Sequence, residues 1–128
     1  MPSNQGYIVK EHPIPTKRYC QTLSLKDHPA LIAEYRKVHS QSEAWPEIRK
    51  GIRSVGILEM EMYILGSQVF MIVETPIDFD WETAMNELSH LPRQEEWEEY
   101  VSRFQKCAPG STSAEKWKLM ERMFYLYD

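Results

Sequence analysis

Two hydrophobic patterns divide the chain into strand-like and helix-like segments. Apolar side chains occupy every second position in several short segments, which predicts β-strands over residues 18–25, 57–65, 68–75 and 120–126. Apolar residues return at helical spacing elsewhere, which predicts helices over residues 29–40, 46–55, 81–88 and 97–104. Gly66-Ser67 lies between two of the strands and is typical of a tight hairpin turn.

The order of these elements predicts the fold class. Strand, helix, strand, strand, helix and strand form the split βαβ arrangement, an α+β fold in which helices cover one face of a four-stranded antiparallel sheet. The uncovered face favours pairing with a second copy, so we expect a homodimer. Residues 1–17, rich in proline, are predicted to be an extended or poorly ordered lead-in, and residues 18–128 a single domain.

Composition narrows the possible partners. The formal net charge is -4 and both signs are interspersed, which argues against nucleic acid or an anionic membrane surface as the main partner. No apolar run is long enough for a membrane span. Cys20 and Cys107 lack metal-ligand spacing, and a reducing cytoplasm is the expected location, although a disulfide between them stays open.

One histidine is placed for chemistry. Tyr35 and His39 share the inner stripe of the first predicted helix, and Pro46 opens a new helix shortly afterwards. An imidazole at such a break, pointing toward the core, can accept and donate protons near neutral pH. The alternative is a helix-end histidine that only satisfies a backbone carbonyl.

Other polar and aromatic side chains offer further candidates. One face of a predicted strand carries Glu59, Glu61 and Tyr63. These side chains suit acid and base roles. Alternatively, they place charge on a sheet edge or dimer face, which opposes aggregation. The acidic stretch 95–99 is predicted to be a solvated helix surface. The tryptophans suit either stacking against a ring-shaped ligand or packing in the core, and they are Trp45, Trp81, Trp97 and Trp117.

Sequence motifs for nucleotide, zinc and acyl-transfer chemistry do not occur in the chain. There is no glycine-rich phosphate loop, no HExxH, no CxxC pair and no G-x-S-x-G. Acid and base chemistry without a cofactor, or binding alone, remains.

A set of short motifs resembles the L-rhamnose mutarotase family over about residues 18–127. The motifs are Tyr35-x-x-x-His39, Trp45-Pro46-Glu47-Ile48, Gly56, Tyr63, Phe70-Met71-Ile72-Val73-Glu74, Gln94-x-x-Trp97 and Met123-Phe124-Tyr125-Leu126. The resemblance implies a dimeric ferredoxin-like fold, a dimeric α/β barrel, with no metal or organic cofactor. It also implies interconversion of the α and β anomers of a 6-deoxy-sugar, L-rhamnose or a close relative.

The resemblance assigns roles to individual residues. His39 becomes the proton-transfer residue, with Tyr35 and Trp97 in the sugar pocket, and we further expect Tyr63, Trp45 and Glu61 to contact the monosaccharide.

The chain departs from the family pattern in three places. Met60 stands where the family can have a pocket tyrosine, Glu96 where it can have a second tryptophan, and residues 40–44 form a longer connection. An altered pocket leaves L-fucose open as the substrate. A non-catalytic sugar-binding module or a cofactor-free oxygenase on the same fold also stays open.

Overall fold

The computed structural model of the chain describes residues 4–40, 45–108, 111 and 113–127. Its helices and strands follow the sequence pattern closely until the last strand. In chain order they are β1 (Thr16–Ser24), α1 (Pro29–Val38), α2 (Pro46–Ser54), β2 (Glu59–Leu65), β3 (Gln68–Pro76), α3 (Trp81–Ser89), α4 (Gln94–Ser102), α5 (Ser113–Lys116) and β4 (Lys118–Leu119).

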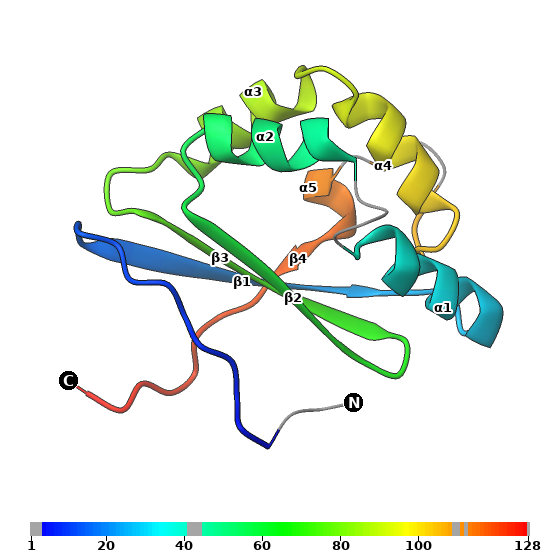
Figure 1. Cartoon of the computed structure of the whole chain (residues 1–128), viewed down its shortest axis with the longest axis horizontal. Coiled ribbons are helices and arrows are strands. Elements are labelled where there is room, and N and C mark those ends of the chain that lie inside the picture. The colour runs from blue at the N-terminus through cyan, green and yellow to red at the C-terminus, as the bar shows by residue number, and fades with distance from the viewer. Residues whose placement is uncertain (1–3, 41–44, 109–110, 112, 128) are drawn as a thin grey trace.

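The strands form one 4-stranded antiparallel sheet in the order β2-β3-β1-β4. The helices lie on one side of this sheet, and the two chain ends lie on the other side (Figure 1). The predicted α+β class and the single layer of helices are therefore confirmed. The strand order follows from the split βαβ connection, which places the first strand between the third and the fourth.

Glycines with left-handed backbone angles end two of the elements. Gly66 has φ 61° and turns β2 into β3, so that Leu65 pairs with Gln68. Gly56 has φ 100° and directly follows the C-cap of α2, where Phe79 lies 3.6 Å from the position that a Cβ would take. Both positions favour glycine because L side chains rarely adopt these angles.

The core lies between the sheet and the helices. Alternate residues of β3 are buried, as the period of a strand requires, and they include Val69, Val73 and Thr75. Tyr35 of α1 and Val101 of α4 pack onto them from the helical layer. α1 and α4 lie toward the end of the sheet where β2 turns into β3 (Figure 1).

The last predicted strand is wrong in its position and in its length. The alternating pattern predicted a strand over residues 120–126, but β4 covers only Lys118–Leu119 and pairs with Thr22 and Gln21 of β1. In the described tail beyond Met120, no residue pairs with a neighbouring strand, and the side chains of Met123 and Phe124 are 96% and 73% exposed. Alternation creates an apolar face, but a strand also needs a partner edge for its backbone hydrogen bonds.

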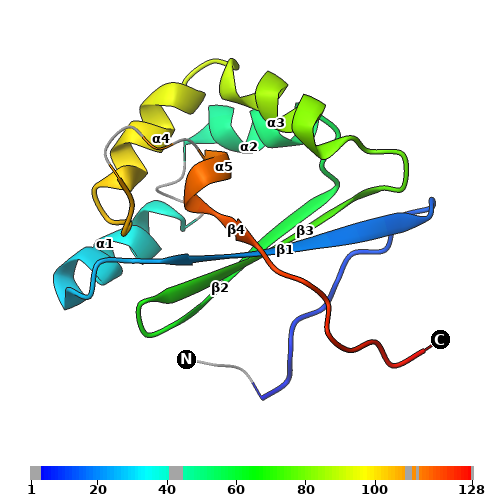
Figure 2. The ribbon, with the colours of Figure 1, turned by 180° about the vertical axis from the view of Figure 1, so that it is seen from behind.

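The proline-rich lead-in crosses the open face of the sheet without regular structure (Figure 2). β1 begins at Thr16, slightly inside the segment predicted to be the lead-in. The ring of Tyr7 packs edge-on against Tyr63 with centroids 5.7 Å apart, and His12 Nε2 lies 2.9 Å from a carboxylate oxygen of Glu59. These contacts occupy the face of the sheet that the helices leave open.

Cys20 and Cys107 are both free thiols. Among the described residues, no helix is long and apolar enough to cross a membrane. Nor do the described His, Cys, Asp and Glu side chains form a group of three or more that could hold a metal ion.

Candidate functional site

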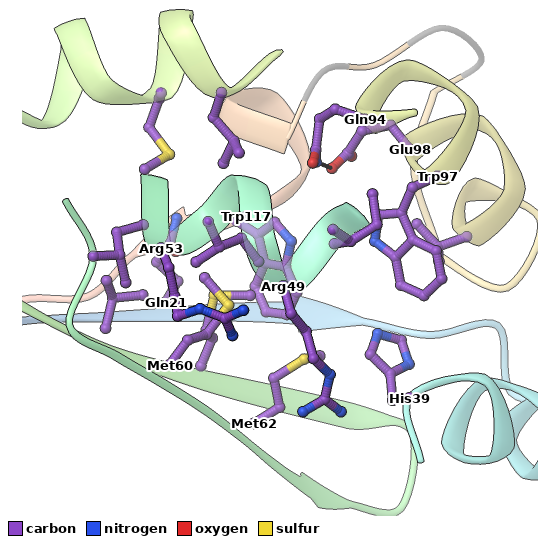
Figure 3. A pocket seen from close by; sticks show the side chains of 18 of the residues that line it. Gln21, His39, Arg49, Arg53, Met60, Met62, Gln94, Trp97, Glu98 and Trp117 are labelled. Carbon is purple, nitrogen blue, oxygen red and sulfur yellow. Dashed lines mark hydrogen bonds between the residues drawn. The ribbon is translucent and has the colours of Figure 1, made fainter. Parts of the chain in front are cut away.

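A cavity of about 630 Å³ lies between the sheet and the helical layer. Side chains from all three long strands, from α1 to α4 and from the segment before β4 line it, and Figure 3 shows them converging on one space. Of the six residues predicted to react with or contact the sugar, four border this cavity, namely Tyr35, His39, Trp45 and Trp97. Glu59, the other candidate carboxylate, also lines it.

His39 is the C-cap of α1. Its imidazole ring is held by a hydrogen bond to the backbone carbonyl of Tyr35, one turn earlier in the helix. Nδ1 is 2.7 Å from the backbone oxygen of Tyr35. A carbonyl oxygen can only accept, so Nδ1 carries the hydrogen and Nε2 keeps a free lone pair. His39 satisfies a helix-end carbonyl and also borders the cavity, so this hydrogen bond is compatible with either sequence interpretation.

The surroundings of His39 favour its neutral form. Burial lowers the pKa of His39 below the ordinary value of 6.5, the hydrogen bond to the Tyr35 carbonyl opposes this shift, and the charge of Arg49 adds to it. Arg49 and Arg53 extend from α2 across the cavity toward β2 (Figure 3). Near neutral pH the imidazole is thus a proton acceptor at Nε2.

Tyr35 lies beside His39, with ring centroids 4.4 Å apart, and is only 3% exposed. Burial raises the pKa of Tyr35 to about 12, so its hydroxyl keeps its proton at any physiological pH. The hydroxyl oxygen accepts a hydrogen bond from Gln105 Nε2 at 3.4 Å. Residues 41–44 of the longer connection predicted over residues 40–44 lie outside the described residues.

Aromatic side chains form the part of the wall next to His39. The Trp97 ring meets His39 edge-on at 5.2 Å between centroids, and Trp45 packs against Trp97 at 5.3 Å. Arg93 covers Trp45, with its guanidinium carbon 4.1 Å from the ring centroid. Trp81 and Trp117 line the cavity as well, so all the tryptophans serve both core packing and the cavity wall.

The structure does not bring Glu61 and Tyr63 to this cavity. Successive residues of a strand face opposite sides of the sheet, so Met60 and Met62 of β2 face the cavity. On the open face, the Tyr63 hydroxyl donates to Glu61 at 2.7 Å and the Tyr63 ring packs against Tyr7.

The two other departures from the family pattern have different positions. Met60, at the tyrosine position, lines the cavity. Glu96, at the position of the second tryptophan, is exposed and lies 3.7 Å from Arg93.

Sequence reasoning missed a polar part of the wall, contributed largely by α4. Gln94, Glu98 and Gln105 line the cavity with Val101 and follow helical spacing, which is the signal that identifies them. The prediction that the whole stretch 95–99 is a solvated surface is wrong for Glu98. Its side chain is only 21% exposed and lies 3.0 Å from Lys116 Nζ.

Comparisons with known proteins identify the family of the chain. The sequence matches the family described as L-rhamnose mutarotase over residues 18–126. A relative from Xanthomonas campestris pv. campestris, named L-fucose mutarotase, is 37% identical over 110 residues, covering 86% of this chain and 88% of its own.

Solved structures agree with the fold. An L-rhamnose mutarotase from Formosa agariphila superposes with a TM-score of 0.65 at 17% identity, covering 87% of this chain and 99% of that one. Tetracenomycin F2 cyclase from Streptomyces glaucescens superposes with a TM-score of 0.55 at 16% identity, covering 88% of this chain and 97% of that one. At these identities the structural likeness shows the ferredoxin-like fold alone. From the family match and the identity with the Xanthomonas protein, the chain belongs to the L-rhamnose mutarotase family and is a sugar mutarotase, an isomerase acting on carbohydrates.

Proposed function

We propose that this protein interconverts the α and β anomers of L-rhamnose or L-fucose by acid and base catalysis at His39. The observation that carries the proposal is an imidazole at the cavity wall whose Nδ1 is occupied by the Tyr35 carbonyl, which leaves Nε2 as the acceptor, and burial lowers the pKa of this ring. Mutarotation requires one proton to leave the anomeric hydroxyl and one to reach the ring oxygen. A base that can return the proton it has taken serves both steps.

The proton transfers balance within one turnover. Nε2 of His39 accepts the proton of the anomeric hydroxyl, the O1–C1 bond becomes a carbonyl, and the C1–O5 bond breaks. The ring oxygen takes up the proton from the imidazolium, which restores the neutral histidine and leaves the open-chain aldehyde. Rotation about C1–C2 presents the other face of the carbonyl, and the reverse steps close the ring to the second anomer.

Tyr35 assists this reaction as a hydrogen-bond donor in our proposal. Its pKa of about 12 keeps the hydroxyl protonated, and its ring lies against His39. A donor fixed in a buried site stabilises the negative charge that develops on the oxygens of the sugar.

The composition of the cavity wall suits a 6-deoxy-sugar. Trp97, beside His39, offers apolar ring surface to the C–H surface of a pyranose, and Met60, Met62 and Met71 offer apolar surface to the C6 methyl group. L-Fucose enters the proposal because the 37% identical relative carries that sugar in its name. Saturation-transfer NMR between the anomeric protons of each sugar tests both candidates.

The test has three informative outcomes. Exchange faster than in buffer for either sugar supports the proposal and identifies the better substrate. Calorimetric binding without accelerated exchange would instead indicate a sugar-binding module. No accelerated exchange of any deoxy-hexose, in a buffer that is itself a poor proton-transfer catalyst, would refute the enzymatic role.

We also propose that the enzyme is a homodimer. Large apolar side chains are exposed in both chain ends on the open side of the sheet, and they include Ile8, Val9, Phe124 and Leu126. An apolar surface of this kind is typical of a protein interface. Light scattering at micromolar concentration should give twice the mass of one chain, and a monomer would contradict the proposal.

A cytoplasmic location is the last part of the proposal. The free thiols of Cys20 and Cys107 support it, since exported proteins tend to oxidise paired cysteines. Cell fractionation with an antibody against the protein checks it, and recovery from an extracellular fraction would contradict it.

A further inference from the structure

One polar side-chain atom that is buried at the cavity has no hydrogen-bond partner in the described part of the chain. Gln105 is 2% exposed and lines the cavity, its Nε2 donates to Tyr35, and its Oε1 accepts no hydrogen bond from any described residue. If the amide turns over, Oε1 accepts from the Tyr35 hydroxyl and Nε2 becomes the atom without a partner. A buried polar atom in this state is unfavourable, and a ligand hydroxyl in the cavity would relieve the cost.

A buried ion pair stands on the same wall. Lys116 has a side-chain exposure of 0%, and its Nζ lies 3.0 Å from Glu98 Oε2 and donates to the Glu98 backbone oxygen at 3.3 Å. Gln94 Nε2 donates to the other carboxylate oxygen of Glu98 at 2.9 Å. Lysine is almost never fully buried unless it is paired, so this arrangement holds the Glu98 carboxylate in one position at the cavity wall.

The two features are close to the groups that carry the chemistry. Gln94, Glu98 and Gln105 follow one stripe of α4 and its continuation, and Figure 3 shows Gln94 and Glu98 side by side at the cavity. The charge of Glu98 is near enough to Tyr35 to contribute to the raised pKa of that tyrosine. The polar wall is therefore next to the proposed reacting end, and the methionines provide the apolar surface.

We propose that Gln105 and Glu98, the latter held by Lys116 and Gln94, form a hydroxyl-binding subsite that selects the sugar by the configuration of its secondary hydroxyl groups. The ligand class is an uncharged monosaccharide with adjacent hydroxyls, because Lys116 already compensates the carboxylate. The Gln105 amide presents a polar atom that has no partner among the described residues, and a hydroxyl in the wrong configuration leaves it unpaired. Glu98 adds a charged acceptor whose position is fixed by Lys116 and Gln94. The proposal rests on the proposed function, since it takes a sugar to be the occupant of the cavity.

Gln105→Met separates a binding role from a structural one. The substitution keeps the length of the side chain and removes its polar atoms, so the free protein loses an unsatisfied group and only one long hydrogen bond. We expect an unchanged or raised melting temperature and a dissociation constant for the preferred sugar that is about five- to tenfold higher. Isothermal titration measures this directly, because the sugar is already at anomeric equilibrium and no net reaction heat is released.

Gln68→Met is the matched control. Gln68 lies in the β2–β3 hairpin region, outside the cavity lining, and hydrogen-bonds Thr22 and Ser24. We expect it to lower the melting temperature and to leave the dissociation constant unchanged.

Selectivity is the second measurement. L-Rhamnose and L-fucose share the C6 methyl group but differ in the configuration of the hydroxyls at C2 and C4. The ratio of their dissociation constants should move toward one in Gln105→Met and in the double variant Glu98→Gln with Lys116→Met, which avoids leaving the buried ammonium unpaired.

The results separate this inference from the proposed function. If the wild type exchanges anomers while Gln105→Met binds both sugars as tightly and as selectively as the wild type, the subsite is refuted and the function stands. If the wild type binds without exchange and Gln105→Met binds more weakly, the function fails and the subsite stands. If the wild type binds neither sugar, both the proposed function and the proposed subsite are refuted.

Discussion

Two histidines in this protein end helices in the same way and differ in everything around them. His39 is the C-cap of α1 and His90 is the C-cap of α3. In each, Nδ1 contacts the backbone oxygen four residues earlier, at 2.7 Å to Tyr35 and at 2.8 Å to Asn86. Both rings therefore have the same tautomer, with Nε2 as the remaining acceptor.

The difference lies in what packs against the two rings. His39 is half-buried between Tyr35 and Trp97 at a cavity of about 630 Å³, whereas His90 is exposed and hydrogen-bonds Ser89. The local hydrogen bond orients an imidazole but gives it no substrate. Tertiary packing supplies the cavity, the aromatic walls and the lowered pKa, so the role of His39 is decided by α2, α4 and the sheet.

Replacing each histidine in turn gives the largest expected contrast. His39→Gln should reduce the catalysed exchange of anomeric protons by about 10²- to 10⁴-fold, the usual contribution of a general acid or base. His90→Gln should leave the exchange rate unchanged, because the His90 ring does not line the cavity. Saturation-transfer NMR of both variants under identical conditions checks this, and equal rates for the two would remove the role of His39.

A pair of tyrosines extends the contrast to the two faces of the sheet. Tyr35→Phe should lower the exchange rate about tenfold, since one hydrogen bond to the reacting oxygens is lost. Tyr63→Phe should have no effect on the rate, because the Tyr63 hydroxyl donates to Glu61 on the open face. If Tyr63→Phe were the slower variant, the open face and not the cavity would be the catalytic side.

The pH dependence of the rate reports the burial of His39. In the proposed mechanism the neutral imidazole is the reactive form, and burial lowers the pKa of His39, so kcat/KM should rise with pH to a plateau, with a midpoint below 6.5. In the window between this midpoint and 6.5 the unfolded chain binds more protons than the folded one, so stability also rises with pH there. A midpoint above 6.5 would show that the ring is stabilised as the cation.

Arg49 provides the smallest expected effect. Its charge adds to the lowering of the His39 pKa, so Arg49→Gln should move the midpoint of the pH profile upward while the plateau rate changes little. Arg36→Gln, at the exposed side of α1, is the matched control and should leave the midpoint in place. An unchanged midpoint in Arg49→Gln would mean that the charge of Arg49 does not contribute to the pKa of His39.

Local patterns in the sequence predicted most of the fold. Alternation over β1, β2 and β3, with Gly66 between the last two, was sufficient because these strands pair with one another within the chain. The i, i+4 spacing of Tyr35 and His39 was sufficient to predict that both face the core, because residues at this spacing lie on the same side of a helix. The final strand failed because its pattern carries no information about a partner edge.

The site was only partly predictable. Glu61 and Tyr63 were chosen because carboxylates and phenols suit acid and base chemistry, but which face of β2 meets the helices depends on the whole sheet. That face carries Met60 and Met62. Glu98 was overlooked because it stands in a run of glutamates, and its partner Lys116 lies 18 residues away along the chain. Only the packed structure shows which of these carboxylates turns inward.

A crystal structure of the protein soaked with L-fucose or L-rhamnose tests the central claim most directly. We predict density for a single sugar in the cavity, with the anomeric oxygen within hydrogen-bond distance of His39 Nε2 and the C6 methyl group against the methionine wall. A sugar bound on the open face of the sheet, or bound in the cavity with its anomeric carbon away from His39, would contradict the account.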